Sequence, residues 1–507
     1  MRAVLLSTSD TDGLAAAQSH RPWLWRNPSG VAAEEVTTLL TDADVIVLRL
    51  LGSARTWDGL ISLVTVLEKP LVVVSGEQLI DTELLACSTV SAEIAHVTHL
   101  YLAASGADNM ESLWDYLELA VCTPGMSPRE ASNHVPAPHA HPAWGIMGTD
   151  PGKNELAGAK GRVGIVFYRS HYLAGNTAFI TTLAEAFSTC GGVAVPIFVS
   201  SLRTPDEDLL NYLGTFDALV VTVLAAHQPG QCTFPDSAVT TPWDKDDTWD
   251  GGALARLGIP IFQGLCLTSP HDKWLESDEG MSPLDAASQV AIPECDGRII
   301  TVPFSFKEEG EDGLSRYVAD PERCSRLASL VMRTVRLGYL ANADKRIVLM
   351  LSAYPTKHAR IGNAVGLDTP ASVLALLHAL AAAGYTVDEA AIPGYSIDDP
   401  AADNPAELMK AIIAAGGQDA DWLTDEQVAA NTLRLDAATY EHWLRLCPLQ
   451  LQQKVEDAWG PAPGELFVDA RRSGHPEIFF AGLELGNVLV MVQPPRGFGE
   501  NPVSIYH

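Results

Sequence analysis

A polar loop with three cationic side chains is the part of the sequence that points most clearly to chemistry. Residues 354–372, YPTKHARIGNAVGLDTPAS, follow the short apolar run 346–351 and carry Lys357, His358 and Arg360. A strand, a basic glycine-containing loop and a helix N-terminus together favour anion binding, because backbone N–H groups and cationic side chains meet there. The loop therefore predicts a site for a carboxylate-rich or phosphate-bearing ligand. The alternative is an ordinary strand–loop–helix connection.

The end of this loop carries the sequence signals of a helix start. Asp368 or Thr369 can cap free backbone N–H groups, and Pro370 fits a first helical turn because it has no N–H. We predict a helix over 371–383. Asn363 and Asp368 are candidates for ligand contacts, with loop and cap roles as the alternative.

A second stiff loop lies near the end of the sequence. Residues 493–502, QPPRGFGENP, follow the apolar run 487–492 and present Arg496 and Glu500. Proline and glycine restrict or bend this loop, which would hold both side chains in place. We predict that Arg496 and Glu500 contact the ligand. An Arg496–Glu500 pair that braces the loop is the alternative.

Two more predicted loops directly follow strand patterns, at 170–177 and 263–269. In open parallel sheets, ligands bind beyond the carboxyl ends of the strands. His171, Asn176 and Thr268 are therefore site candidates, although helix capping explains Asn176 equally well. His171 and His358 are also candidate metal ligands, because imidazole binds divalent transition-metal ions.

Residues 123–161 are rich in Pro, Gly, His and Ala and predict a linker or surface excursion. The segment holds His134, His139 and His141. Metal binding is conceivable at the last two, but the sequence nearby offers no further ligands, so we expect a solvated segment. The acidic stretch 242–250 also predicts a solvated loop, because its carboxylates lack the spacing of a calcium loop.

Around these candidates, apolar runs alternate with helix patterns. Runs of four to six residues begin at 3, 45 and 71, with helices expected over 32–40 and 60–68. The pattern restarts at 162 and again at 345. The fold class is therefore α/β, with several Rossmann-like or flavodoxin-like parallel-sheet units in series and helical insertions. We predict a first unit over 1–122 (a head), the linker 123–161, a second unit over 162–340, and the start of a body domain over 341–507.

Composition limits the partners. The 507 residues carry 33 Lys+Arg against 63 Asp+Glu, a formal charge of −30, so nucleic acid and anionic lipid are unfavourable partners. No run is long enough for a membrane span or signal-peptide core. The eight cysteines form no CxxC pair, which indicates reduced thiols in a cytoplasmic protein and argues against a cysteine zinc site.

Common nucleotide and catalytic motifs are absent from the sequence. It contains no GxxxxGK[ST] loop, no GxGxxG after the first strand, and no HExxH or GxSxG. If the reaction needs ATP, we expect another subunit to bind it.

Four stretches resemble one family: LLSTSDTD (5–12), ITVPFSFKEEGEDGLSRYVADPERC (300–324), the loop at 354–372 and PPRGFGENPVSIYH (494–507). They are similar to the large subunit of aerobic cobaltochelatase, CobN, in the CobN/magnesium chelatase large-subunit family. The resemblance covers essentially the whole chain. Magnesium chelatase shares a looser form of these stretches.

The resemblance implies a metal chelatase, a ligase that forms nitrogen–metal bonds in cobalamin (vitamin B12) biosynthesis. Such a subunit binds hydrogenobyrinic acid a,c-diamide and Co²⁺, while AAA+ motor subunits of the CobS/CobT type hydrolyse ATP with Mg²⁺. The carboxylates of the corrin suit Lys357, Arg360 or Arg496. Insertion also requires loss of pyrrole protons and removal of water from cobalt, for which carboxylates and a histidine are suitable.

The sequence departs from the family in one respect. Large subunits are more than twice this long, and a His-Gly-containing stretch of their second half, associated with chelation, does not occur here. We therefore expect the N-terminal part of such a subunit, truncated and inactive alone. The alternatives are a non-catalytic tetrapyrrole-binding or docking fragment and, more weakly supported, a magnesium chelatase subunit acting on protoporphyrin IX.

Overall fold

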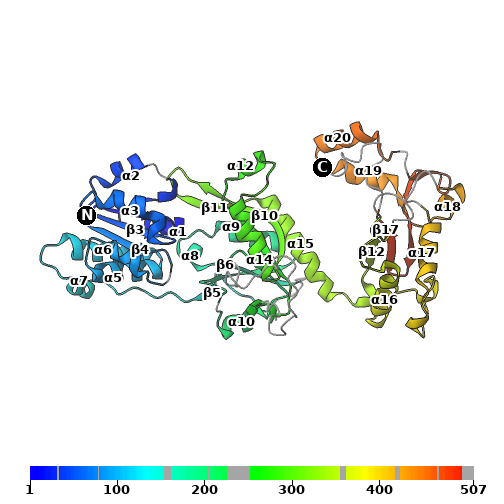
Figure 1. Ribbon diagram of the computed structural model, residues 1–507, viewed down its shortest axis with the longest axis horizontal. Helices are drawn as coiled ribbons and strands as arrows, with labels where there is room; N and C mark the ends of the chain where they lie inside the picture. Colours follow the sequence, from blue (N-terminus) through cyan, green and yellow to red (C-terminus); the bar gives the residue numbers. More distant parts are fainter. Residues whose placement is uncertain are drawn as a thin grey trace. The chain divides into compact units, whose positions relative to one another are not determined.

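The computed structural model places the chain in two units, Met1–Arg336 (unit 1) and Leu337–His507 (unit 2) (Figure 1). The residues that the structure describes are 1–30, 33–77, 79–152, 161–203, 205–224, 252–353, 361–416, 423–464 and 467–493. Both units are mixed α/β, in agreement with the predicted fold class.

The first apolar runs form sheet A, which is parallel throughout and has the strand order β2-β1-β3-β4. Its strands are β1 (Ala3–Ser7), β2 (Leu24–Arg26), β3 (Val45–Leu50) and β4 (Leu71–Ser75). Every residue of β1, β3 and β4 is buried, because helices cover both faces. One face packs on α1 (Asp10–Gln18), α5 (Ala92–Ala104) and α6 (Ala107–Leu117). The other packs on α2 (Ala33–Leu40), α3 (Asp58–Thr65) and α4 (Thr82–Ala86).

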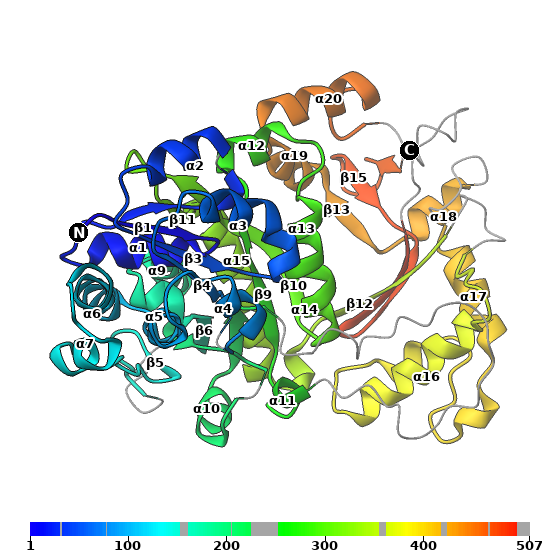
Figure 2. The ribbon, with the colours of Figure 1, turned by 60° about the vertical axis from the view of Figure 1, so that its left-hand side comes forward.

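Sheet B has seven strands in the order β11-β10-β9-β8-β6-β7-β5. They are β5 (Trp144–Ile146), β6 (Arg162–Tyr168), β7 (Val193–Val199), β8 (Ala218–Val221), β9 (Ile261–Leu267), β10 (Ile299–Glu309) and β11 (Ser315–Ala319). Only the edge strands β5 and β11 run antiparallel to their neighbours. The helices α9 (Ala178–Thr189) and α15 (Pro321–Tyr339) pack on one face, and α10 (Glu207–Leu213) and α11 (Gly252–Ala255) on the other. Figure 2 shows β11 beside α1, so sheet B reaches the helices of sheet A.

Two predicted loops are wrong in part, because a helix or a strand occupies some of their residues. The segment predicted as a loop at 170–177 begins with a short helix, α8 (Arg169–Leu173), and much of the 263–269 segment belongs to β9. The seven-residue strand β9 is buried at every position, so its glycine and polar residues gave a misleading loop signal. The segment 123–161 contributes α7 (Pro128–His134), which begins with a Ser127–Glu130 capping box, and the edge strand β5.

The remaining helices of unit 1 are short. They are α12 (His271–Glu276), α13 (Pro283–Ala286) and α14 (Ile292–Cys295). Thr268, a predicted site residue, donates its backbone N–H and its hydroxyl to Asp285 of α13. Asp285 is fully buried, so Thr268 anchors this helix to the end of β9.

The described residues of unit 2 form two three-stranded sheets. Sheet C is formed by β12 (Ile347–Leu351), β16 (Gly482–Leu485) and β17 (Val488–Val492), and sheet D by β13 (Arg434–Asp436), β14 (Val468–Asp469) and β15 (Glu477–Phe479). The helices are α16 (Thr369–Ala382), α17 (Pro405–Ala414), α18 (Asp425–Ala430), α19 (Ala437–Arg445) and α20 (Leu449–Trp459). Sheet C packs on α16 and α17 through one apolar core, and the predicted strands at 346–351 and 487–492 are confirmed.

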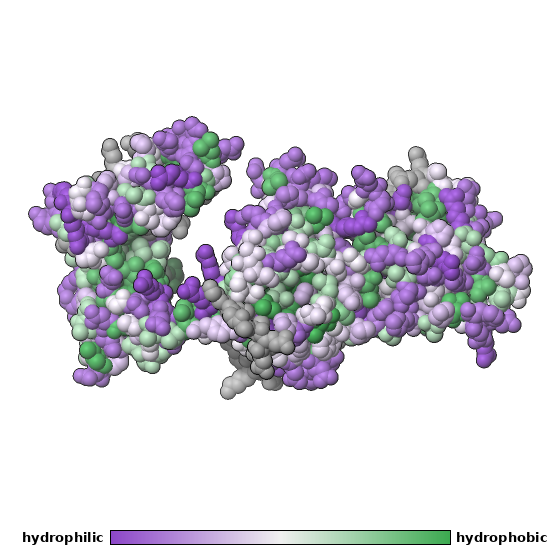
Figure 3. Space-filling model, turned by 180° about the vertical axis from the view of Figure 1, so that it is seen from behind, coloured by the Kyte–Doolittle hydropathy of each residue, from purple (hydrophilic) through white to green (hydrophobic). Residues whose placement is uncertain are grey.

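Hydrophilic residues dominate the surface. In Figure 3 most of the visible face is purple or pale, with smaller green apolar areas. A formal charge of −30 over the whole sequence agrees with this polar surface. None of the helices that the structure describes is long and apolar enough to cross a membrane.

Candidate functional site

A cavity of about 530 Å³ lies in unit 1, where strands of sheet A and sheet B end. Residues that follow β1, β3 and β4 line it from sheet A, and residues at the ends of β6, β7 and β10 line it from sheet B. Such a position is expected for a ligand site, because the loops beyond the carboxyl ends of parallel strands meet at one edge. The lining side chains that could contact a ligand include Thr8, Ser9, Asp10, Thr11, Asp12, Arg49, Ser105, Arg169, Ser170, His171, Asn176, Ser200, Lys307, Ser315, Arg316 and Tyr317.

A buried ion pair forms part of this wall. Arg49 Nη1 donates to Asp12 Oδ1 at 2.6 Å, and the two side chains are 8% and 4% exposed. The Ser7 hydroxyl donates to the other oxygen of Asp12, also at 2.6 Å, and Arg49 Nη2 donates to Gly76 O at 3.3 Å. The pair ties the ends of β1, β3 and β4 together, so it fixes the shape of the cavity on the side of sheet A.

The first turn of α1 adds hydroxyl and carboxylate groups. The Ser9 and Thr11 hydroxyls lie 2.8 Å apart, and the Ser9 side chain caps no backbone N–H. Asp10 forms an ion pair with Lys307 of β10 and accepts from Asn27 Nδ2 at 3.1 Å. The Lys307–Asp10 pair therefore joins the two sheets across the cavity and neutralises one of its cations.

His171, predicted as a site residue, lines the cavity from α8. Its ring packs among Tyr168, Phe179 and Tyr317, with centroids 5.4–6.1 Å away, and its Nδ1 lies 3.3 Å from Asn176 Nδ2. Burial, reinforced by the charge of Lys307 and opposed by Asp10, lowers the pKa of His171 to about 4. The imidazole is therefore neutral at pH 7, which is the form that accepts protons or binds a metal.

Asn176, the other predicted residue of this loop, is buried and makes contacts on two sides. Besides the contact with His171, its Oδ1 accepts from Tyr317 N at 3.2 Å. Asn176 thus links α8 to β11. Nearby, Gly175 has a φ of +64°, and a Cβ there would lie 2.2 Å from Gln18 Nε2. Gln18 donates to Ala174 O at 2.6 Å, so only glycine allows the end of α1 to approach this turn so closely.

Arg169 differs from the other cations of the cavity, because no carboxylate among the described residues pairs with it. Arg49, Lys307 and Arg316 have partners in Asp12, Asp10 and Asp312. Arg169 instead donates from Nη1 to the backbone oxygens of His141 and Pro142, at 3.1 and 3.3 Å. Burial lowers its pKa. A guanidinium without a carboxylate partner among the described residues, in a cavity that serine and threonine side chains also line, suits a ligand with carboxylate or amide oxygens.

The predicted residues of unit 2 are only partly described. Asp368 caps α16 by accepting from Ala371 N at 3.2 Å, so the predicted helix start is confirmed. Asn363 is exposed, and its backbone oxygen accepts from Ser352 Oγ at 3.4 Å. Five further candidates lie outside the described residues: Lys357, His358, Arg360, Arg496 and Glu500.

Sequence reasoning missed most of the cavity. The hydroxyls after β1 and the Asp12–Arg49 pair were not predicted as site residues, although they directly follow or interrupt apolar strands. Arg49 in particular stands inside the buried run Val45–Leu50. A cationic side chain within an apolar strand needs a buried partner. The arginine inside this apolar run was therefore the sequence feature that could have indicated a buried ion pair.

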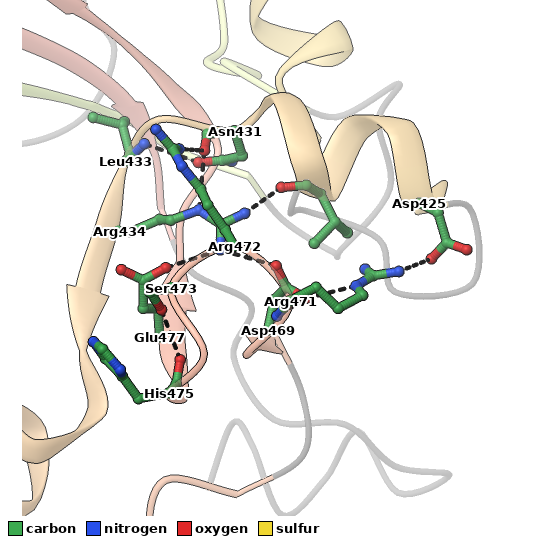
Figure 4. Close-up of polar contacts among 11 residues, drawn as sticks. Asp425, Asn431, Leu433, Arg434, Asp469, Arg471, Arg472, Ser473, His475 and Glu477 are labelled. Atoms are coloured by element: carbon green, nitrogen blue, oxygen red, sulfur yellow. Dashed lines mark hydrogen bonds and ion pairs between the residues drawn. The ribbon is translucent and has the colours of Figure 1, made fainter.

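A dense polar cluster in unit 2 is structural (Figure 4). The Arg434 side chain is 6% exposed and contacts Asp469 at 3.0 Å and Glu477 at 3.3 Å, from Nη1. It also donates from Nε to Asn431 O at 3.0 Å and from Nη2 to Val428 O. Because its guanidinium is occupied by acceptors of the protein, Arg434 braces sheet D against α18 and leaves no evident donor for a ligand.

Comparisons with known proteins all point to the same family. The sequence matches the profile of the CobN/Magnesium Chelatase family over residues 99–507. It is 31% identical to aerobic cobaltochelatase subunit CobN of Pseudomonas aeruginosa, over 93% of this chain and 36% of the relative. It is 25% identical to the magnesium-chelatase H subunit of Cereibacter sphaeroides, over 73% of this chain and 30% of the relative. The chain thus spans about a third of the length of these curated relatives.

The fold is also similar to a solved structure. The catalytic subunit of cobaltochelatase from Mycobacterium tuberculosis matches with a TM-score of 0.69 and 45% sequence identity. The match covers 100% of this chain and 40% of that one.

Proposed function

The chain belongs to the CobN/magnesium chelatase family, and on this premise we propose that it is the N-terminal part of the large subunit of an ATP-dependent cobaltochelatase. In this proposal it acts in cobalamin biosynthesis, where Co²⁺ is inserted as a substrate into hydrogenobyrinic acid a,c-diamide. The observation that carries the proposal is the match to CobN over 93% of this chain.

Cobalt rather than magnesium is favoured by the degree of similarity. The chain is 31% identical to a CobN subunit and 45% identical to the catalytic subunit of a solved cobaltochelatase. It is 25% identical to a magnesium-chelatase H subunit. A magnesium chelatase acting on protoporphyrin IX is therefore the second candidate.

ATP is assigned to partner subunits. The sequence has no GxxxxGK[ST] loop, so this chain lacks the usual cradle for the β- and γ-phosphates. We propose that AAA+ motor subunits of the CobS/CobT type bind ATP and Mg²⁺, and that the whole complex forms the nitrogen–metal bonds.

We propose that the cavity of unit 1 holds part of the substrate. Two of the stretches that resemble the family line it: 5–12 supplies the hydroxyls and carboxylates after β1, and 300–324 supplies Lys307 and Tyr317. Hydrogenobyrinic acid a,c-diamide carries both carboxylate and amide groups. Arg169 would pair with a carboxylate, and the surrounding hydroxyls would hydrogen-bond to carboxylate or amide oxygens.

The neutral His171 is proposed as a transient metal ligand at this cavity. Its lowered pKa leaves the ring unprotonated at pH 7, so a nitrogen lone pair can bind a metal ion, whereas a pKa of about 4 makes the ring a weak acceptor for a pyrrole proton. The loop residues Lys357, His358, Arg360, Asn363, Asp368, Arg496 and Glu500 remain proposed substrate contacts from unit 2.

An absorbance titration with hydrogenobyrinic acid a,c-diamide tests the cavity. Arg169→Met should weaken binding by about 1–3 kcal/mol, the range for a hydrogen bond to a charged group. The matched control is Arg326→Met, because Arg326 is 60% exposed and paired with Glu322 on α15. Equal affinity of the Arg169 variant and the wild type would remove the cavity from the proposed site. Binding to the motor subunits without corrin binding would instead favour the docking fragment.

A further inference from the structure

Three metal-ligating side chains from distant parts of the sequence converge in unit 1. Asp108 lies in the first turn of α6, while His139 and His141 lie between α7 and β5. His139 Nδ1 is 2.8 Å from Asp108 Oδ2, and His141 Nε2 is 3.3 Å from Asp108 Oδ1. The three ligand atoms all lie within 4.8 Å of one another, and this is the one such group of three among the described residues.

A buried amide holds the histidine segment against α6. Asn109 is 1% exposed. Its Oδ1 accepts from His139 N at 2.8 Å, and its Nδ2 donates to His139 O at 3.0 Å and to Ser105 O at 2.7 Å. This two-point contact fixes the backbone of His139 beside Asp108. The convergence of the cluster is therefore determined by a buried contact and not by the exposed side chains alone.

The backbone next to the cluster also leaves room for it. Gly106 precedes α6 with a φ of +94°. A Cβ at this position would lie 2.8 Å from both Asp108 Oδ1 and His141 Nε2. Glycine is thus needed for the conformation and for the space that the two ligand atoms occupy.

We propose that Asp108, His139 and His141 bind a divalent transition-metal ion, Zn²⁺ or Co²⁺. Two imidazoles and one carboxylate form a typical three-ligand set, with a fourth position left for water. At metal–ligand distances near 2.0–2.1 Å, tetrahedral ligand atoms lie roughly 3.3 Å apart. The separation of 3.3 Å between His141 Nε2 and Asp108 Oδ1 fits, whereas His139 Nδ1 contacts the other oxygen, Oδ2, at 2.8 Å, so the carboxylate or the His139 ring must turn for all three residues to reach one ion. Imidazole ligands disfavour Mg²⁺ and Ca²⁺.

The cluster is accessible to a metal ion from solvent. The side chains of His139 and Asp108 are 66% and 50% exposed, whereas that of His141 is 15% exposed. Without metal, the same ring nitrogens contact the carboxylate of Asp108. Metal binding therefore replaces these contacts with bonds from the same ring nitrogens to the ion.

A titration of the whole chain, without a polyhistidine tag and after removal of metals with EDTA, tests the proposal. Co²⁺ is added alone and followed by its visible d–d absorption, which reports the coordination geometry, and Zn²⁺ is then added as a competitor. We expect one Co²⁺ per chain, displaced by Zn²⁺. Replacing either histidine by alanine should weaken binding at least about tenfold, and Asn109→Ala by about 10–100-fold, as expected for a residue that orients a ligand.

His134→Ala is the matched control. His134 is exposed, lies five residues before His139, and its Nδ1 contacts Glu130 O of its own helix at 2.8 Å. This variant should bind Co²⁺ like the wild type. Asp108→Asn keeps the size of the side chain and should weaken binding with an unchanged far-UV circular dichroism spectrum. Absence of stoichiometric binding, or equal affinity of the His141→Ala and wild-type chains, would overturn the proposal and leave only hydrogen bonds between Asp108 and the two histidines. Neither result depends on corrin binding, so this test and that of the proposed function fail separately.

Discussion

The buried Asp12–Arg49 pair offers a sharp test of how the cavity is built. Asp12→Ala removes the carboxylate that Arg49 Nη1 and the Ser7 hydroxyl both contact at 2.6 Å. Among the residues that the structure describes, the Arg49 guanidinium would keep only the contact to Gly76 O at 3.3 Å, since its Nε has no partner there. Because its side chain is 8% exposed, water cannot readily replace the lost acceptor. Leaving such a charge unpaired costs about 3–5 kcal/mol.

The double variant Asp12→Ala/Arg49→Met removes both charges, and we expect it to lose only about 1–2 kcal/mol, since apolar replacement of a buried pair is often nearly neutral. The control is Asp42→Ala, which breaks the exposed Arg2–Asp42 pair at 3.1 Å, with side chains 43% and 74% exposed. This change should cost less than about 1 kcal/mol.

Hydrogen exchange measured on peptides of β1 and β3 gives the local free energy of opening, with peptides of β12 in unit 2 as an internal reference. This assay separates unit 1 from unit 2, which a single global melting curve does not. If Asp12→Ala destabilises β1 and β3 no more than Asp42→Ala does, or if the double variant is as unstable as the single one, the reasoning is refuted.

Three further predictions concern pH, unit 2 and the basic loop. The folded-state pKa of His171, about 4, lies below its unfolded value of 6.5. The free energy of unfolding should therefore fall by up to about 3 kcal/mol as the pH drops from 6.5 to 4. Urea unfolding of His171→Phe should lack this pH-dependent loss. Arg434→Met should lower the unfolding free energy of unit 2 by about 2–4 kcal/mol, because it leaves the buried carboxylate of Asp469 with Arg471 as its remaining cationic partner among the described residues. Hydrogen exchange in β13 at the wild-type rate would contradict this prediction. Lys357→Ala with Arg360→Ala should weaken corrin binding by about 1–3 kcal/mol in a fluorescence titration, and unchanged affinity would exclude both residues from the site.

Three strands of sheet A, β1, β3 and β4, were predictable because burial on both faces gives continuous apolar runs, whereas the short edge strand β2 was not predicted. The runs beginning at 45 and 71 became β3 and β4 with little change in their bounds. The helix start at Asp368 was equally clear, since a capping residue followed closely by proline is typical of a first helical turn. Residues within each segment determine these strands and this helix start, so the sequence alone predicts them.

The site depended on contacts between distant residues. Asp12 and Arg49 are 37 positions apart, and the sequence does not show which carboxylate a buried arginine will meet. His139 and His141 were noticed, but the missing ligand, Asp108, lies 31 positions before His139. At 170–173, part of a five-residue helix, α8, stands where the position directly after a strand pattern had suggested a loop, and His171 of this helix packs against the rings of Phe179 and Tyr317.

The proposed function is tested most directly by titrating the purified chain with hydrogenobyrinic acid a,c-diamide and, in parallel, with protoporphyrin IX. We predict saturable binding of the corrin with a Kd on the order of micromolar and clearly weaker binding of the porphyrin. Tighter binding of the porphyrin would favour the magnesium chelatase. Failure to bind either macrocycle would contradict the assignment of a substrate site to this part of the subunit.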